Sequence, residues 1–477
     1  MKKNNAGFIL GLFSVAVCCM LLLPRLLSYG LFFDGLTYSS IARNLAEGYG
    51  SFWKTYYTDT LYKVFYEHPA FSFWLQSFFF RIFGQAFYIE AIYSGILCFI
   101  LIYVLHLLWN RINDGHIKLS GSWLVILFFS SLPIVSWAYS NNMIENTFAI
   151  ILLLSVFTIY STLFTELSKF SFLKAFLSGV FIFLGFLTKG PGALFPIATP
   201  FIAFLFLKEV SLKKALFLTL FQGAGIIACV LIFVAPNSQA INFFHNYFNN
   251  QLKNSLSGQR EVASSHFALL KKLFQELLAP AVLALLLWAW QRGKLVFNTR
   301  IVLFFLVVAF SASAPYLISP KQMGWYIIPS LPFYVIVLAL LFGNQALKLE
   351  KYLTEKKTPR NVFLTISVVL LFVSVSVMFS EYKVVRKEKS FFNDIYSQKI
   401  NFPERGYVSI YPKRLSSAWG LIADMQRYYK VSLSDSLVYN YCIALKENEK
   451  DSVLLKNNYS VKVSSGNNFI VLKKQNK

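Results

Sequence analysis

Long runs of apolar residues, separated by short basic segments, recur along most of this 477-residue chain. A bilayer core of about 30 Å needs roughly 20 apolar residues in each helix that crosses it. Because only 14% of the residues are charged and 56% are hydrophobic, the chain cannot cover a water-soluble surface, and a soluble enzyme is excluded. We expect about eleven transmembrane helices, near 7–29, 86–109, 121–140, 145–164, 174–188, 191–207, 214–235, 273–291, 300–318, 325–343 and 361–380.

Two places in this pattern need interpretation. The runs on either side of Lys189 are short, so they are either two tilted helices or one broken helix. The first run follows Met1-Lys2-Lys3 and is longer than the apolar core of a signal peptide, so we interpret it as a retained membrane anchor.

The basic residues predict the orientation of the chain. The formal net charge is +23, but the Lys and Arg are spread over short connections instead of gathering on one face, so nucleic acid is not an indicated partner. With the N-terminus in the cytoplasm, the basic connections near 111–118, 169–174, 208–214, 292–300 and 348–360 are all cytoplasmic, as the positive-inside rule requires. We therefore expect a multi-pass protein of the cytoplasmic membrane. Its outer segments are then 30–85, 236–272, 319–325 and everything after about 381.

The last hundred residues differ in composition from the rest. They are polar and contain no apolar run long enough to span a membrane. Short β-rich segments at 407–411 and 469–473 alternate with a helical pattern at 421–429. We predict a transmembrane part, 1–380, followed by a small extracytoplasmic α/β domain, 381–477.

The outer loop 30–85 is too long to be a simple connection. Asp34-Gly35 precedes a helical stripe of Tyr38, Ile41 and Leu45, with Gly48 where the helix should end. A second amphipathic helix is predicted from about 68 to 80. Two such helices would lie on the membrane surface, and long loops with their own structure tend to carry function.

Asp34 is the first candidate for chemistry. It stands where an apolar helix meets the membrane interface, a position where an ionised group is costly unless it is used or solvated. The alternative is that Asp34 caps the surface helix, and one side chain can do both.

Three basic residues should approach the same side of the membrane as Asp34. They are Lys189, Lys321 and Arg260. Taken singly, each Lys can be a side chain that snorkels to the lipid headgroups. Trp325 and Tyr326, which follow Lys321, can be part of an aromatic belt at the membrane interface. Together with one carboxylate, the cations suit a substrate that carries phosphate.

Other polar residues are open to both a structural and a functional interpretation. Glu145, at the start of an apolar run, either caps its helix or binds substrate. Glu67, His68 and His266 are possible ligands of a divalent metal, although their spacing gives little support. No Gly-rich phosphate loop occurs, so no nucleotide cofactor is indicated.

Several short motifs occur in an order that resembles the polytopic glycosyltransferases of the GT-C superfamily, which use lipid-phosphate sugars. This superfamily includes the protein O-mannosyltransferases and the aminoarabinose transferases that modify lipid A. The resemblance covers roughly the first 345 residues. The motifs are FDGLTY at 33–38, IARN at 41–44, YEHP at 66–69, FWL at 73–75, LTKGP at 187–191 and YIIP at 326–329.

The resemblance implies roles for individual residues. The acid of the first outer loop is catalytic in the family, which corresponds to Asp34. The family often has a second acid directly after it, where this chain has Gly35. Aminoarabinose transferases have Lys before Pro-Pro, where this chain has His68 and one Pro, and a His is only partly charged near neutrality.

Lys189 and Tyr326 match two of these motifs, and residues outside the motifs complete the expected site. Lys189, Lys321, Arg260, His68 and Tyr326 are expected to hold the donor phosphate. Glu67, Glu145 and Tyr38 are expected to bind substrate, and Glu67 with His266 is a possible metal site.

The predicted activity is transfer of a sugar from a polyprenyl-phosphate donor to a lipid or protein acceptor on the outer face of the membrane. Asp34 would take the acceptor proton, and the cations would stabilise the departing phosphate. The alternative is a transporter or flippase for a lipid-linked or small anionic substrate. Transporters, however, place their ionisable residues near the bilayer midplane.

Overall fold

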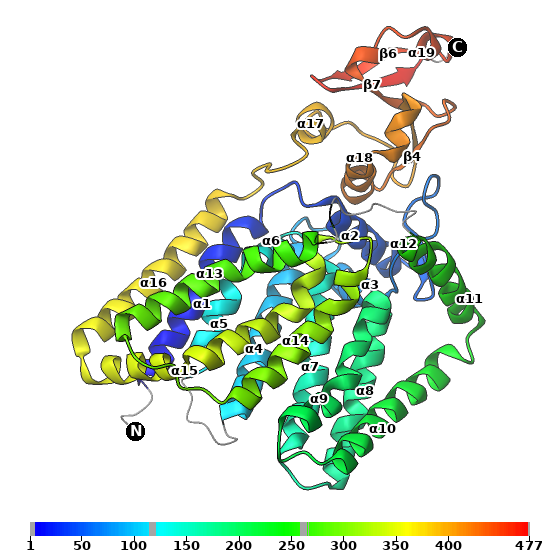
Figure 1. Ribbon diagram of the computed structural model, residues 1–477. Helices are drawn as coiled ribbons and strands as arrows, with labels where there is room; N and C mark the ends of the chain where they lie inside the picture. Colours follow the sequence, from blue (N-terminus) through cyan, green and yellow to red (C-terminus); the bar gives the residue numbers. More distant parts are fainter. Residues whose placement is uncertain (1–4, 114–120, 258–264, 266, 476–477) are drawn as a thin grey trace.

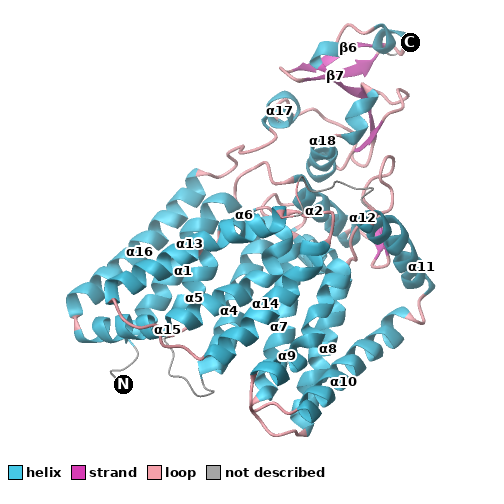
Figure 2. Cartoon of the chain, viewed as in Figure 1, coloured by secondary structure: helices cyan, strands magenta, loops and turns pink. Residues whose placement is uncertain are grey.

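The computed structural model describes residues 5–113, 121–257, 265 and 267–475. Within them the chain forms a bundle of long helices, with a small sheet region beyond one end of the bundle (Figures 1 and 2). We call this end of the bundle the sheet end; α1 begins at the opposite end (Figure 1). The helices of the bundle are α1 (Asn5–Leu26), α4 (Ile89–Asn113), α5 (Trp123–Ser130), α6 (Pro133–Ser140), α7 (Ile144–Leu163), α8 (Lys169–Lys189), α9 (Thr199–Phe206), α10 (Leu212–Cys229), α13 (Ala268–Gln291), α14 (Thr299–Ile318), α15 (Leu331–Glu355) and α16 (Lys357–Ser380).

The bundle is a membrane fold by length and composition. Among the described residues, nine helical segments are long and apolar enough to cross a membrane, or ten if the bent pair α5–α6 is one span. This pair bends by 71° where Pro133 begins α6, because a proline cannot continue the hydrogen bonding of the preceding helix. The count is below the expected eleven partly because 169–206 is a single apolar segment.

That segment folds back on itself at Gly190, whose φ of +77° ends α8. In a straight helix, 18 residues would separate Ser178 from Pro196 by about 27 Å. Instead, the side chain of Gln222 donates to both Ser178 Oγ (2.9 Å) and the Pro196 carbonyl (3.2 Å). The helical turns η1 (Gly190–Ala198) therefore run back along α8 and lead into α9. Of the two interpretations offered by the sequence, the structure has the pair of helices.

Shorter elements gather at the sheet end, and the two helices expected in the loop 30–85 are present. In the first, α2 (Phe33–Ala46), the predicted stripe of Tyr38, Ile41 and Leu45 is buried, and Gly48 follows its end with φ +77°. The other elements here are α3 (Phe71–Phe83), α11 (Ser238–Asn246), η3 (Tyr247–Leu252), α12 (Lys253–Leu256), η4 (Gly324–Ser330) and the two-residue strands β1 (Gly50–Ser51) and β2 (Lys54–Thr55).

The C-terminal region contains a five-stranded mixed sheet, in agreement with the expected α/β composition. The strand order is β4-β3-β5-β7-β6, with β3 parallel to both of its neighbours and the last three strands antiparallel. The strands are β3 (Tyr407–Tyr411), β4 (Ser432–Ser434), β5 (Tyr441–Leu445), β6 (Tyr459–Ser465) and β7 (Phe469–Lys474). The predicted helix over 421–429 is present as α18 (Trp419–Asp424), continued by η7 (Met425–Tyr429). The shorter helical pieces are α17 (Lys389–Phe391), η5 (Phe392–Tyr396), η6 (Lys413–Ser417), η8 (Lys446–Asn448) and α19 (Ser452–Lys456).

One hydrophobic core joins the C-terminal region to the loop 30–85. Tyr38 and Ile41 of α2 belong to the same buried cluster as Leu421, Ile422 and Met425. In Figure 1, α18 lies directly against α2 at the sheet end. Because the two parts share a core, the expected division into 1–380 and 381–477 stays a prediction.

Candidate active site

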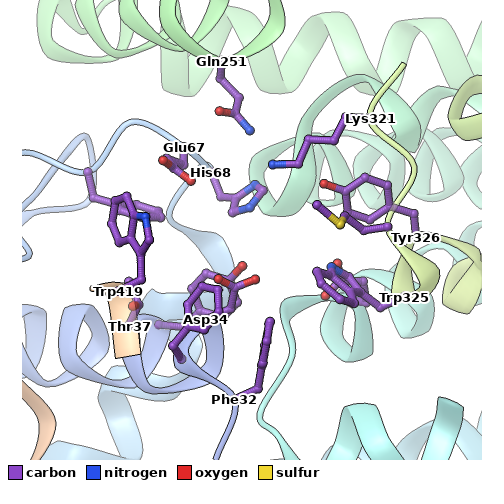
Figure 3. Close-up of a pocket in the computed structure, with 15 residues that line it drawn as sticks. Phe32, Asp34, Thr37, Glu67, His68, Gln251, Lys321, Trp325, Tyr326 and Trp419 are labelled. Carbon is purple, nitrogen blue, oxygen red and sulfur yellow. The ribbon is translucent and has the colours of Figure 1, made fainter. Parts of the chain in front are cut away.

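A cavity of about 340 Å³ lies at the sheet end, where the start of α2 faces the connection between α14 and α15 (Figure 3). Residues from six separate parts of the chain surround it, and they include both polar groups and aromatic rings. The lining residues are Phe32, Phe33, Asp34, Thr37, Tyr38, Phe65, Glu67, His68, Glu145, Gln251, Lys321, Met323, Trp325, Tyr326 and Trp419.

The N-terminus of α2, which carries Asp34, is fixed by two asparagines that follow α6. The Phe32 N–H donates to Asn141 Oδ1 (2.7 Å), and Asn142 Nδ2 donates to the Gly35 carbonyl (3.0 Å). Phe32 is the N-cap residue of α2, and no side-chain hydrogen bond caps this helix. The interpretation of Asp34 as a helix cap is therefore wrong, and its carboxylate is available to the cavity.

Gly35 cannot be replaced by a second acid in this arrangement. A Cβ added at Gly35 would lie 1.9 Å from the carbonyl oxygen of Asn141, far inside any real contact. The close approach of α2 to the Asn141 backbone thus explains why a single carboxylate begins the helix.

The pKa of Asp34 is raised from its ordinary 3.8 to about 7. Burial is the main cause, and the negative charges of Glu145 and Glu67 add to it, while Lys189 and Lys321 oppose it. A carboxyl group with a pKa near the working pH can accept a proton and release it again. Asp34 therefore has the properties of a general base.

Lys189 and Glu145 form a buried ion pair beside the cavity. The Lys189 Nζ also lies 4.1 Å from the centre of the Tyr326 ring, a cation–π contact. Glu145 and Tyr326 line the cavity and Lys189 lies behind them. Glu145 Oε2 is buried and has no hydrogen-bond partner among the described residues, so it can accept a hydrogen bond from a substrate.

The glycines after Lys189 allow two tyrosine hydroxyls to press against the backbone. A Cβ at Gly190 would lie 2.1 Å from the Tyr247 hydroxyl, and one at Gly192 would lie 2.0 Å from the Tyr316 hydroxyl. These contacts fix the turn in which Lys189 lies, so the sequence around Lys189 has a structural reason in addition to any functional one.

The structure brings most of the predicted residues together. Asp34, Lys321 and Tyr326 line one cavity, and Lys321 projects into it from the α14–α15 connection (Figure 3). Glu67, His68, Glu145 and Tyr38 line it as well, and their predicted roles stay predictions. Arg260 and His266 lie outside the described residues.

Metal binding finds no support in the part of the chain that the structure describes. There, no three His, Cys, Asp or Glu side chains come together as a ligand set. His266 lies outside the described residues, so the role of Glu67 and His266 as metal ligands stays a prediction.

Sequence reasoning missed four residues that shape the cavity. No role was expected for Asn141 and Asn142, and the structure places them in a constrained turn, with a positive φ at Asn142 (+53°). Gln251 projects from η3 into the cavity, and Trp419 comes from the C-terminal region (Figure 3). No local sequence signal connects these two residues with Asp34.

Comparison with known proteins gives a likeness of structure. The sequence matches no known family profile and no curated protein. Two crystal structures of ArnT from Cupriavidus metallidurans, in the apo state and bound to undecaprenyl phosphate, match 97% of this chain and 97% of theirs, with TM-scores of 0.64 and 0.62 and 13% sequence identity. The chain has an ArnT-like fold.

The ArnT likeness confirms the expected fold: a helical membrane protein with a small C-terminal sheet region. An Archaeoglobus fulgidus oligosaccharyltransferase, in complex with an inhibitory peptide and a dolichol-phosphate, also matches 95% of this chain and 72% of its own. Its TM-score is 0.45 at 11% identity.

Proposed function

We propose that this protein is an integral-membrane glycosyltransferase that moves a sugar from a polyprenyl-phosphate donor to an acceptor. The observation that carries the proposal is the shared cavity of Asp34 and Lys321, in which a carboxyl group with a pKa of about 7 faces a fixed cation. The ArnT-like fold supports it, because one of those structures holds undecaprenyl phosphate.

Asp34 acts as the base in this mechanism. The acceptor oxygen attacks the anomeric carbon of the donor while its proton passes to the Asp34 carboxylate. The bond between the anomeric carbon and the phosphate oxygen breaks, and its electron pair stays with the phosphate. Such a direct displacement inverts the anomeric centre. A positioned base typically accelerates this kind of step by about 10²–10⁴-fold.

Lys321 stabilises the phosphate as it leaves. Its ammonium group enters the cavity beside Tyr326, whose hydroxyl is a second possible donor (Figure 3). Fixed cations aimed at developing charge usually supply the largest part of such catalysis. Lys189, tied to Glu145, adds a positive charge behind the cavity wall. Glu145 Oε2 accepts a hydrogen bond from a sugar hydroxyl, which orients the donor.

The cavity belongs on the outer face of the cytoplasmic membrane. The connections α9–α10 and α15–α16 lie at the end of the bundle away from the sheet region (Figure 1). Several Lys lie in these connections and in the adjoining helix ends: Lys208, Lys213, Lys214, Lys351, Lys356 and Lys357. The positive-inside rule assigns that end to the cytoplasm. The N-terminus is then cytoplasmic and the C-terminal region extracytoplasmic.

The test uses purified protein in lipid nanodiscs with undecaprenyl phosphate carrying a tritium-labelled sugar. We expect Asp34→Asn to abolish release and transfer of the label, and Lys321→Ala to reduce turnover by at least about tenfold. Lys356→Ala, a matched change at the opposite end of the bundle, should have no effect. Full activity of Asp34→Asn would contradict the assigned base. Movement of intact donor across a vesicle membrane, without cleavage, would instead indicate a transporter.

A further inference from the structure

One wall of the cavity comes from the C-terminal region, although every catalytic group proposed above precedes residue 330. Trp419, the first residue of α18, lines the same cavity as Asp34. Lys321 and Trp419 enter this cavity from different sides (Figure 3). The C-terminal region thus forms part of the site.

Trp419 is held in a defined position. Its indole packs against the Tyr62 ring, with centroids 4.2 Å apart and planes inclined by 30°. The Tyr62 hydroxyl donates to the carbonyl of Ser416, in the turn before α18 (3.3 Å). Leu421 and Ile422, on the other face of α18, are buried in the core shared with α2. An aromatic side chain fixed in this way loses little further freedom when it binds a ligand.

Buried polar contacts also fix the distance between Trp419 and Asp34. Arg43 of α2 is buried and donates to the backbone carbonyl of Gln426. Arg427 forms a buried ion pair with Glu90, at the start of α4. These contacts hold α2, which carries Asp34, and the helical stretch that begins with Trp419 against each other.

These contacts leave part of the Trp419 side chain uncovered. Tyr62 covers part of it, yet Trp419 remains 36% exposed at a cavity that also contains Glu67 and His68. A residue that only docked the C-terminal region would gain more from full burial. The C–H bonds on one face of a sugar ring are polarised by the ring oxygens, so they are attracted to the negative face of an aromatic ring.

We propose that Trp419 is the binding platform for a sugar ring of the acceptor, so that the nucleophile is a sugar hydroxyl of a glycan or glycolipid. This inference rests on the proposed function and narrows its acceptor. The donor phosphate is tied to a membrane lipid and belongs beside Lys321 and Tyr326, which flank the spans α14 and α15. Trp419 belongs to the part of the chain beyond the spans, where an acceptor arrives.

The reaction balances with this assignment. The sugar hydroxyl oxygen of the acceptor forms the new bond to the anomeric carbon of the donor, and its proton goes to Asp34. The electron pair of the broken bond leaves with the lipid phosphate. Stacking on Trp419 would orient one hydroxyl of the acceptor ring toward Asp34.

The experiment measures two rates with each of four labelled donors. Each donor is undecaprenyl phosphate that carries tritiated glucose, galactose, mannose or arabinose. One rate is release of the label to water, and the other is transfer to octyl glucoside, octyl phosphate or a Ser/Thr peptide. We expect transfer to the glycoside. Trp419→Ala should raise the KM for this acceptor about tenfold or more, with a smaller effect on release to water. Trp419→Phe should recover much of the loss.

Tyr407→Ala is the matched control, because Tyr407 is an exposed aromatic residue of the same region that stacks on Tyr439. It should leave the acceptor KM unchanged. Transfer to octyl phosphate or the peptide instead of the glycoside would overturn the inference and leave the proposed function intact. An equal loss of both rates in Trp419→Ala would overturn it as well, because the indole would then act only in folding. Absence of any release or transfer in the wild type would overturn the proposed function itself.

Discussion

Asp34 should give the transfer reaction a pH dependence in the neutral range. A base works only when it is ionised, and a pKa of about 7 leaves about half of Asp34 ionised at pH 7. The ionised share is about one tenth at pH 6 and about nine tenths at pH 8. The rate should therefore rise about tenfold per pH unit below pH 6, about fivefold between pH 6 and pH 7, and level off above pH 8.

Glu145 offers a way to move this profile without touching the base. Its charge raises the pKa of Asp34, as does that of Glu67, while Lys189 and Lys321 lower it. Glu145→Gln removes one negative charge and also releases Lys189 from its ion pair. Both changes favour the ionised form of Asp34, so its pKa should fall. We expect the midpoint of the pH profile to move down by about one pH unit or more.

The assay is the rate of sugar transfer between pH 5 and 9 at saturating donor, for the wild type and the variant. His68 lines the same cavity and is titratable, so His68→Asn is measured in parallel and should retain the midpoint near pH 7. Glu355→Gln, at an exposed residue on the opposite end of the bundle, is the matched control. An unchanged midpoint in Glu145→Gln, or a profile that vanishes in His68→Asn, would refute the assignment.

Two further changes test how the site is held in place. Gly35→Ala should lower both the melting temperature and the transfer rate, because the new Cβ would collide with the Asn141 carbonyl. Gly11→Ala is the control and should be neutral, because nothing lies near its added Cβ. Equal behaviour of the two variants would contradict the close packing of α2. Arg427→Met should destabilise the protein by about 3–5 kcal/mol, because it leaves Glu90 buried and unpaired. Thermal unfolding measures this loss, and Glu90→Gln in the Arg427→Met background should restore part of it; a loss below about 1 kcal/mol would contradict the buried pair.

Features that depend on local sequence could be predicted well. The stripe of Tyr38, Ile41 and Leu45 predicts α2, because it reflects one buried face. The β-rich composition of 407–411 predicts β3. The resemblance of short motifs predicted the fold, which structural similarity to ArnT confirms.

Features that depend on contacts between distant residues could not be predicted. Lys189 was expected to hold the donor phosphate, and no sequence pattern indicates its buried ion pair with Glu145, 44 positions earlier. Glycine at position 35 departs from the family pattern, and only the packed backbone of Asn141 explains it. Trp419 shares no sequence pattern with Asp34, since the two meet only after the C-terminal region has packed on α2.

The core shared by α2 and α18 has a consequence for any attempt to divide this protein. A chain cut after Ser380 would keep its long helices but remove α18 from α2 and leave Glu90 without Arg427. The helix that presents Asp34 would then lose its covering layer. A C-terminal segment from another such protein can replace this one only when the face of its helix that packs on α2 is complementary to the α2 side chains.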